Sequence, residues 1–179
     1  MKKMLKNEGF TLIELLIVVA IIGIIAAIAV PGLMRARMSG NEASAIGSLR
    51  TINSSQATYA SSCGGGGYGE DLNALATAPA GGGPTFIPED LADADTTDED
   101  QPKSGYGFVV TQPAGTVVVM AAANTCNAFA DSHTQFFGAA APTDPGNTGT
   151  RYFGTDHSGM IRQDPANPIA VITDGQPLQ

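Results

Sequence analysis

The sequence has no tryptophan, only two histidines and two cysteines, and almost no basic charge beyond position 50. Six of its nine lysines and arginines precede position 51: Lys2, Lys3, Lys6, Arg35, Arg37 and Arg50. Nine of the seventeen acidic residues lie between Glu70 and Asp100, and the net charge is −8. Because phosphate contacts need a basic face, this composition argues against nucleic-acid binding by the bulk of the protein. We interpret the excess of acidic residues as a feature that keeps an exposed domain soluble.

A second long apolar run is also absent. The single run occupies residues 10–30 and contains one charged side chain, Glu14. As a helix it would extend about 31 Å, which matches the hydrocarbon thickness of a bilayer. Lysines precede the run, so its N-terminal end is expected in the cytoplasm. The pattern predicts that the 179-residue chain crosses the membrane once and that its remainder forms one small extracytoplasmic domain.

A cleaved secretory signal is the alternative interpretation of this run, because Ala27, Ile28 and Ala29 fit a small-x-small cleavage site. Two features argue against it. The apolar run is longer than the core of a signal peptide, and it contains Glu14.

Glu14 is the informative residue of the run. A carboxylate within a membrane span is costly unless it has a partner, and it therefore marks a functional position. No basic residue inside the span can reach it, since Arg35 and Arg37 lie at the opposite end. Its partner must come from outside this segment, or the group must remain protonated.

The segment from Lys6 to Pro31, KNEGFTLIELLIVVAIIGIIAAIAVP, closely resembles the class III leader and N-terminal helix of type IVa pilins and type II secretion pseudopilins. The resemblance implies cleavage between Gly9 and Phe10 by a prepilin peptidase, which also methylates the new Phe10 amine. It further implies that Glu14 pairs with the Phe10 amine of a neighbouring subunit. Cleavage would thus create the cation that the buried carboxylate lacks.

The resemblance also implies the partners and the location. The expected partners are further copies in a homopolymer or a mixed filament, the peptidase and methyltransferase, and an inner-membrane assembly platform. The protein would lie in the inner membrane before assembly and in a periplasmic or cell-surface filament, a fimbrium, afterwards.

A long helix is predicted from about Thr11 to Ser61. Gly23 and Pro31 are the expected places for a kink or a short unwound stretch, because proline removes a backbone donor. Beyond Pro31 one face carries Leu33, Met34, Met38, Ile46, Leu49, Ile52, Gln56 and Tyr59, and the opposite face carries Arg35, Asn41, Glu42, Ser48 and Ser55. We expect Arg35 and Arg37 in the lipid headgroup region or on a solvated face, and not in a partner-binding basic patch.

The remaining segments predict an α+β fold in which the long helix packs on a small antiparallel sheet, as in pilins. Leu72 and Leu75 suggest one helical turn, and Phe136-Phe137 either starts a strand or fills the core. The expected strands are 106–111 and 116–121 in one hairpin, 151–155 and 160–163 in a second hairpin, and 169–172 at the end. The chain is divided into a leader (1–9), a membrane or filament-core helix (10–31), an amphipathic half-helix (32–62) and a globular head (63–179).

Cys63 and Cys126 are expected to form a disulfide if the head is exported to an oxidising compartment. Two buried free thiols are the alternative. His133 with these cysteines does not give a zinc-binding spacing.

No enzyme, metal site or cofactor is expected. Asp156, His157 and Ser158 have the residue types of a catalytic triad, but consecutive residues of one turn cannot converge as a triad must. The glycine-rich stretch 64–69 lacks the features of a phosphate loop. The acidic stretch 92–100 is expected to be a solvated loop, since it lacks the glycine and terminal glutamate of a calcium-binding EF-hand.

The leading hypothesis is a structural subunit of a type IV pilus or pilus-like filament. The alternatives are a major-type pseudopilin of a type II secretion system and a membrane-anchored binding module. Gly9-Phe10 and Glu14 favour a filament subunit over a simple anchor, because an anchor needs neither.

Overall fold

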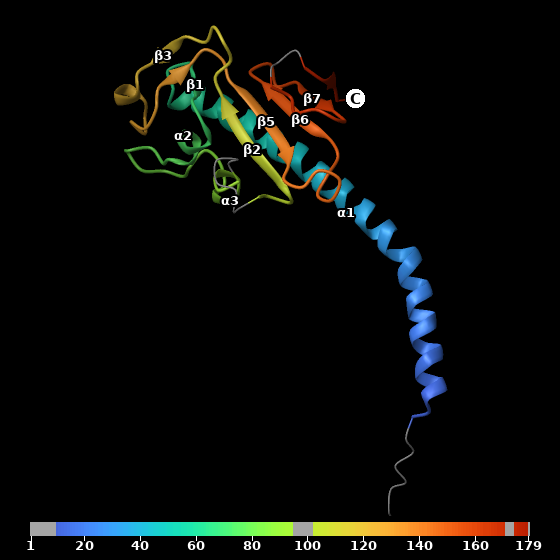
Figure 1. Ribbon diagram of the computed structural model, residues 1–179. Coiled ribbons are helices and arrows are strands. Elements are labelled where there is room, and N and C mark those ends of the chain that lie inside the picture. Colours follow the sequence, from blue (N-terminus) through green and yellow to red (C-terminus); the bar gives the residue numbers. More distant parts are fainter. Residues whose placement is uncertain (1–9, 95–101, 171–173, 179) are drawn as a thin grey trace, which may run out of the picture. The chain divides into compact units, whose positions relative to one another are not determined.

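The computed structural model describes residues 10–94, 102–170 and 174–178 (Figure 1). Gly9, the basic residues before it and most of the acidic stretch 92–100 lie outside the described residues. Two compact units divide between Arg37 and Met38. The long helix α1, Leu12–Ser62, crosses this boundary, and every other described element belongs to the second unit, which we call the head unit.

Helix α1 has the extent that its sequence predicts. It spans 51 residues, and its α-helical pattern continues through Gly23 and Pro31. The short unwound stretch expected there is therefore not observed. The helix ends where Cys63 N and Gly64 N both donate to Tyr59 O at 2.8 Å, followed by Gly65 with a φ of 61°. Glycine favours this left-handed conformation, which explains why the helix stops at a glycine run.

The buried face of α1 only partly follows the expected stripe. Leu49, Ile52, Gln56 and Tyr59 are buried as predicted, and Leu33 and Met34, which precede the head unit, are exposed. Three of the residues assigned to the opposite face are also buried: Glu42, Ser48 and Ser55. Serine is small enough to face a close neighbour, and Ser55 Oγ donates to Phe86 O at 2.7 Å.

A five-stranded antiparallel sheet packs along this part of α1 (Figure 1). Its order is β2 (Tyr106–Thr111), β5 (Phe137–Pro142), β6 (Tyr152–Asp156), β7 (Ile161–Asp164) and β8 (Gln176–Pro177). All four pairings are antiparallel, so the predicted α+β fold, with a long helix on a small antiparallel sheet, is confirmed.

Gly138 in β5 lies where the sheet faces α1. A Cβ placed on it would be in ordinary contact with side-chain atoms of Leu49 and Ile52, at 3.9 Å, but only 3.2 Å from Thr155 Cγ2 of the neighbouring strand. The core between these layers is aromatic and aliphatic, with Tyr106, Phe108 and Phe153 fully buried from the sheet side. Burying such apolar area is the main stabilising term for a unit of this size.

A smaller three-stranded sheet lies beyond the end of α1. Its order is β1 (Tyr68–Gly69), β4 (Ser132–His133) and β3 (Val118–Met120). Two short helices, α2 (Leu72–Ala76) and α3 (Glu89–Ala92), and a 3-10 turn, Ala122–Asn124, complete the described elements. The helical turn expected from Leu72 and Leu75 is confirmed, since both side chains are buried in α2.

The two predicted hairpins have different outcomes. The hairpin across residues 156–159 is confirmed, because β6 pairs with β7. The hairpin across residues 112–115 is wrong, because β2 pairs with β5 and β3 pairs with β4 in the other sheet. Strand β2 is largely buried and needs a buried partner, whereas the valines of β3 are exposed.

The last predicted strand, 169–172, is not found as predicted. Ile169 is buried outside any strand, residues 171–173 lie outside the described residues, and the final strand is β8.

The disulfide between Cys63 and Cys126 is confirmed, with the two Cα atoms 4.6 Å apart and a sequence separation of 63 positions. It joins the end of α1 to the segment that follows the 3-10 turn. The backbone reinforces this junction, since Cys126 N donates to Cys63 O at 3.3 Å.

Replacing both cysteines by alanine should destabilise the head unit by about 4 kcal/mol, because the cross-link restricts a long loop in the unfolded chain. Urea unfolding of the full chain in detergent, followed by near-ultraviolet circular dichroism, measures this loss. Reduction of the unsubstituted chain is the matched control and should give the same loss. An unchanged midpoint in both samples would contradict a stabilising role of the bond.

Candidate functional site

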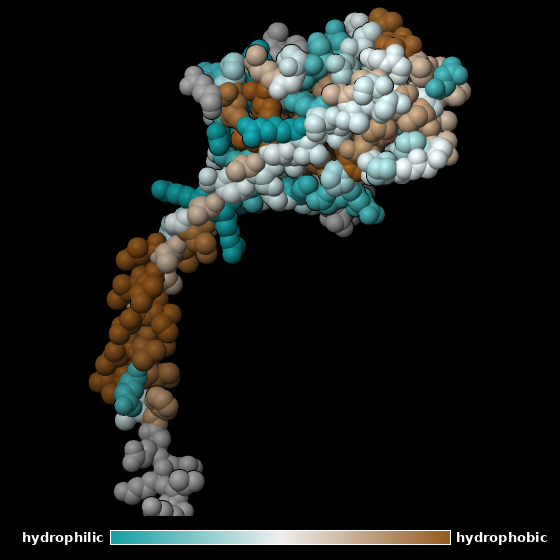
Figure 2. Space-filling model, turned by 180° about the vertical axis from the view of Figure 1, so that it is seen from behind, coloured by the Kyte–Doolittle hydropathy of each residue, from teal (hydrophilic) through white to brown (hydrophobic). Residues whose placement is uncertain are grey.

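The N-terminal part of α1 exposes a continuous series of large apolar side chains. Their exposed fractions range from 44% at Met34 to 92% at Phe10, and Figure 2 shows this surface as a hydrophobic column. Among the described residues, α1 is the one helix long and apolar enough to cross a membrane. An apolar surface of this size requires lipid or other apolar chains around it.

Thr11 and Glu14 form a reciprocal pair at the start of α1. Thr11 N and Thr11 Oγ1 donate to Glu14 Oε2 at 2.9 and 2.7 Å, and Glu14 N donates back to Thr11 Oγ1 at 3.3 Å. This arrangement is a capping box, which satisfies backbone donors that the first helical turn leaves free. The Thr-x-x-Glu spacing before an apolar run signals this arrangement in the sequence, but our sequence analysis overlooked it.

The capping box gives Glu14 neutral hydrogen-bond donors and no cation. No ion pair among residues 10–94, 102–170 and 174–178 includes Glu14. The negative charge on this side chain therefore remains available to a cation from outside the described chain.

Gly23 has no heavy atom within 4 Å of the position that a Cβ would occupy. A larger side chain would meet no steric obstacle from the chain itself at this point. The proposed kink at Gly23 and Pro31 remains a prediction about the assembled or membrane-bound helix.

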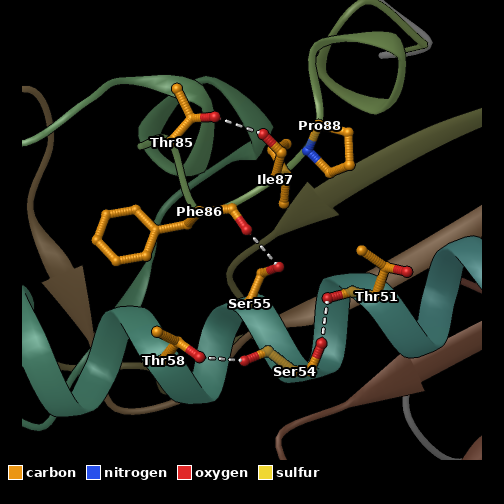
Figure 3. Close-up of a pocket in the computed structure, with 8 residues that line it drawn as sticks. All are labelled: Thr51, Ser54, Ser55, Thr58, Thr85, Phe86, Ile87 and Pro88. Carbon is orange, nitrogen blue, oxygen red and sulfur yellow. Dashed lines mark hydrogen bonds between the residues drawn. The ribbon is translucent and has the colours of Figure 1, made fainter. Parts of the chain in front are cut away.

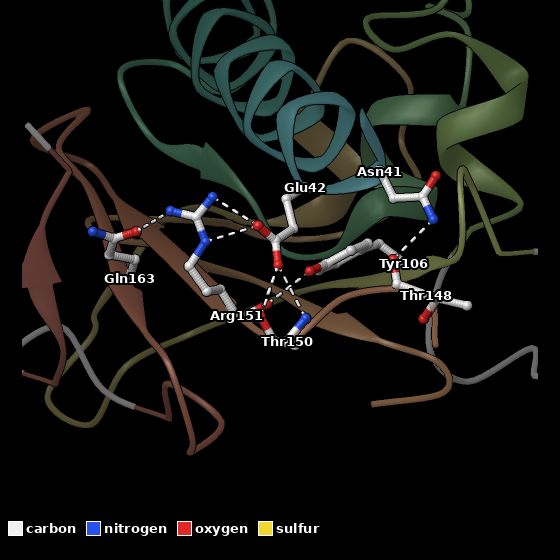
Figure 4. Close-up of polar contacts among 7 residues, drawn as sticks. All are labelled: Asn41, Glu42, Tyr106, Thr148, Thr150, Arg151 and Gln163. Atoms are coloured by element: carbon white, nitrogen blue, oxygen red, sulfur yellow. Dashed lines mark hydrogen bonds and ion pairs between the residues drawn. The ribbon is translucent and has the colours of Figure 1, made fainter. Parts of the chain in front are cut away.

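Glu42 connects α1 to the head unit through a buried ionic cluster (Figure 4). Glu42 Oε2 lies 2.7 Å from Arg151 Nη2 and accepts from Arg151 Nε at 2.8 Å. Glu42 Oε1 accepts from Thr150 N at 3.0 Å and from Thr150 Oγ1 at 3.1 Å. Two guanidinium nitrogens thus contact one carboxylate oxygen, Oε2, and the other oxygen, Oε1, is held by Thr150.

Arg151 has further partners around its guanidinium. Its Nη1 donates to Gln163 Oε1 at 2.7 Å, and its Cζ lies 5.4 Å from the centre of the Phe153 ring. A buried ion pair is stabilising only when its remaining hydrogen-bonding groups are also satisfied, and this cluster meets that condition.

Two neutral groups complete the cluster. Asn41 Nδ2 donates to Thr148 O, and Tyr106 Oη donates to Arg151 O, each at 2.8 Å. Burial and then the nearby Glu42 charge raise the pKa of Tyr106, so its hydroxyl remains a donor at neutral pH.

The electrostatics of Glu42 favour its charged form. Burial alone would raise the pKa of the Glu42 carboxyl, but hydrogen bonds from Thr150 and the Arg151 guanidinium outweigh burial and hold the pKa below its ordinary value. This role could not be predicted from the sequence, because a single glutamate and an arginine 109 positions later carry no shared local pattern.

Gln56 forms a second buried polar link between α1 and the rest of the head unit. Its Nε2 donates to Gly69 O at 3.0 Å, and its Oε1 accepts from Gly69 N at 2.7 Å. The amide thus pairs with both backbone groups of a β1 residue, which fixes that strand at the end of the helix.

One surface groove lies between α1 and residues 85–88 (Figure 3). Hydroxyl groups line it, but these donate to nearby backbone carbonyls: Ser54 Oγ to Thr51 O, Thr58 Oγ1 to Ser54 O, and Thr85 Oγ1 to Ile87 O. These hydroxyls are engaged in local backbone contacts and do not converge on a common point.

His157 and Ser158 lie in the turn between β6 and β7, as predicted, and Asp156 is the last residue of β6. Asp156 Oδ1 accepts from Ser158 N at 2.7 Å, and Ser158 Oγ accepts from Met160 N at 3.3 Å. No hydrogen bond of the described residues joins His157 to Ser158, so the three side chains stabilise a turn.

Comparison with known proteins bears on the N-terminal segment. The family model described as the prokaryotic N-terminal methylation motif matches residues 4–30. These residues include Gly9, Phe10 and Glu14, and they define a protein with a prepilin-type N-terminus.

Two curated relatives match part of the chain. The type IV major pilin protein PilA of Myxococcus xanthus is 44% identical over 54 residues, 30% of this chain and 24% of that protein. The type IV wide pilus major component PilA4 of Thermus thermophilus is 60% identical over 35 residues, 20% of this chain and 27% of that protein. The chain thus matches about a quarter of the length of each relative.

No solved structure matches the chain significantly. The resemblance of the N-terminal residues to type IV pilins is confirmed by the motif and by both relatives.

Acidification should lower the free energy of unfolding of the head unit, because Glu42 loses its charge. Because the pKa of Glu42 is lowered in the folded chain, its contribution is present above the ordinary pKa and is lost as the pH falls through the lowered value. Glu42→Gln should destabilise the head unit by about 2 kcal/mol at pH 7. Urea unfolding of the full chain at pH 7 and in acid measures both effects.

Glu89→Gln is the matched control, since Glu89 is an exposed acid of α3. It should unfold like the unsubstituted chain at pH 7. If the loss caused by Glu42→Gln were as large in acid as at pH 7, the charged contact would not be its source.

Proposed function

We propose that this protein is a structural subunit of a type IV pilus, cleaved between Gly9 and Phe10, methylated at Phe10 and assembled through α1. The observation that carries this proposal is a methylation motif on an apolar helix whose one charge has no cationic partner among the described residues. Before assembly, lipid surrounds this helix. After assembly, the helices of other copies surround it.

The proposal assigns separate tasks to the two acidic residues of α1. Glu14 lies four positions after the new N-terminus, and an amine on Phe10 of a neighbour supplies the cation that Glu14 lacks. Glu42 already has its cation, Arg151, within the same chain. Glu14 therefore acts between subunits, and Glu42 acts within one.

The same proposal sets the partners and the location. A prepilin peptidase and methyltransferase processes the chain, and an inner-membrane platform receives it. The chain lies in the inner membrane with its N-terminus in the cytoplasm, and then in a filament on the periplasmic side or at the cell surface.

The relatives' names favour a pilus over a secretion pseudopilus, since both are named as type IV pilus components. Deletion of the gene, followed by filament imaging and a secretion assay, separates these two functions. A membrane-anchored binding module would require neither N-methylation nor Glu14, so N-methylphenylalanine on the chain in sheared surface filaments argues directly for assembly.

Glu14→Gln should leave cleavage and methylation intact but reduce incorporation into filaments at least tenfold, because a charged contact between subunits is lost. Glutamine also completes a capping box, so this substitution removes the charge and preserves the start of the helix. Mass spectrometry of the mature N-terminus and quantification of sheared filaments measure the two steps.

Thr11→Val is the complementary control, because it removes the capping hydroxyl and keeps the charge of Glu14. It should assemble far better than Glu14→Gln. If Glu14→Gln formed filaments normally, the proposed role of this carboxylate in assembly would be contradicted.

A further inference from the structure

A small cavity of about 160 Å³ lies between α1 and the turn that joins β6 to β7. Its walls include Asn53 from α1, Tyr68 from β1, Phe136, and Asp156 and His157 from the turn. This cavity is separate from the ionic cluster of Glu42 and from the hydroxyl-lined groove. Its residues come from segments far apart in sequence, which the fold brings together.

Asp156 supplies negative charge to this cavity. The residue is only 5% exposed, and its Oδ1 accepts from Ser158 N at 2.7 Å. In the part of the chain that the structure describes, Oδ2 has no hydrogen-bond donor and no cation is paired with this carboxylate. A buried carboxylate without a cationic partner is costly, so a positively charged ligand would be favoured here.

Aromatic rings form another wall of the cavity. The centres of the Tyr68 and Phe136 rings lie 5.1 Å apart, and those of Tyr68 and His157 lie 6.5 Å apart. Ring faces attract cations, and they also stack against the flat guanidinium group. Rings beside a carboxylate are therefore suited to a guanidinium or an ammonium group.

The position of Asn53 is fixed by its own hydrogen bonds. Its Nδ2 donates to Thr155 Oγ1 at 2.7 Å, and its Oδ1 accepts from the same hydroxyl at 3.1 Å. This wall is therefore formed before any ligand arrives. A metal ion is less suited, because no group of three histidine, cysteine, aspartate or glutamate residues meets among the described residues.

Outside α1, the lysine and the two arginines of the head unit already have partners. Lys103 pairs with Asp90 at 2.9 Å, Arg151 pairs with Glu42, and Arg162 Nη1 donates to Gly175 O at 3.4 Å. The remaining basic residues of the described chain are exposed on α1 and make no ion pair within it: Arg35, Arg37 and Arg50. Each copy thus presents free guanidinium groups on α1 and one cavity that lacks a cation.

We propose that the Asp156 cavity binds the guanidinium group of an α1 arginine from a second copy of this chain. The contact is heterologous, because a helix surface of one copy meets a different surface of the next. Such a contact repeats along a filament without closing into a dimer. The identity of the occupant, a second copy of the chain, rests on the proposed function. The affinity of the cavity for a guanidinium group is independent of that function.

The first experiment tests the cavity on the full chain in detergent micelles. N-acetyl-arginine methylamide is titrated against the protein while nuclear magnetic resonance follows the ring protons of Tyr68 and His157. N-acetyl-citrulline methylamide, a neutral ligand of nearly the same shape, and glucose serve as comparison ligands. The arginine derivative should shift these signals, and Asp156→Asn should weaken its binding about tenfold or more.

Asp144→Asn is the matched variant, since Asp144 is also a turn carboxylate with a local hydrogen bond, to Asn147, but is exposed. It should bind like the unsubstituted chain. Equal shifts from the arginine and citrulline derivatives, or a preference for glucose, would overturn the cationic assignment.

The second experiment identifies the occupant in filaments. Both native cysteines form the disulfide, so the added cysteines are the free thiols of each chain. Ser158→Cys is combined in turn with Arg35→Cys, Arg37→Cys or Arg50→Cys, and sheared filaments are oxidised. One of the three pairs should give a ladder of cross-linked subunits.

Asn147→Cys replaces Ser158→Cys in the control set, because Asn147 lies in a different exposed turn. Filaments that form without a cross-link specific to position 158 would contradict a second copy as the occupant. If the unsubstituted chain formed no filaments, the proposed function itself would fail, while the titration would still decide whether the cavity binds a guanidinium group.

Discussion

A single helix, α1, must satisfy two different surroundings, and the rest of the structure depends on this constraint. The backbone groups of α1 form hydrogen bonds within the helix along its length, but its apolar side chains need contacts from outside the helix. Up to Met34 the large apolar groups are exposed, whereas from Glu42 onward one face is buried in the head unit. The first part has no covering from the described residues of its own chain, so it is complete only in lipid or among other copies.

Three contacts attach the C-terminal part of α1 to other segments of the head unit, and each uses a different chemistry. Glu42 makes a charged contact with Arg151, Gln56 makes amide hydrogen bonds with Gly69, and Cys63 makes a covalent bond with Cys126. The apolar core between them stabilises the fold, but apolar burial is not directional. These polar and covalent links fix the register of the helix against its partners.

The sequence predicted those features that depend on local pattern. The length of α1, the β6–β7 hairpin and the short helix at Leu72 follow from hydrophobic period and turn residues, and the Thr11–Glu14 cap could also have been predicted. Strand pairing across long separations could not, since nothing near Thr111 indicates that β5 is its neighbour. The burial of Glu42 was hidden for the same reason, because its cation is distant in sequence. The cavity at Asp156 likewise exists only after four separate segments meet.

The spacing of the outer two attachments has a mechanical consequence. Glu42 and Cys63 are 21 residues apart on α1, about 31 Å at 1.5 Å per residue. Tension that enters the head unit from the N-terminal side reaches the ionic cluster first and the covalent bond last. The ion pair can break and re-form under load, whereas the disulfide keeps the helix from being drawn out of the sheet. Under load the Glu42–Arg151 contact can therefore open at one end of the head unit, while the disulfide at the other end keeps α1 attached.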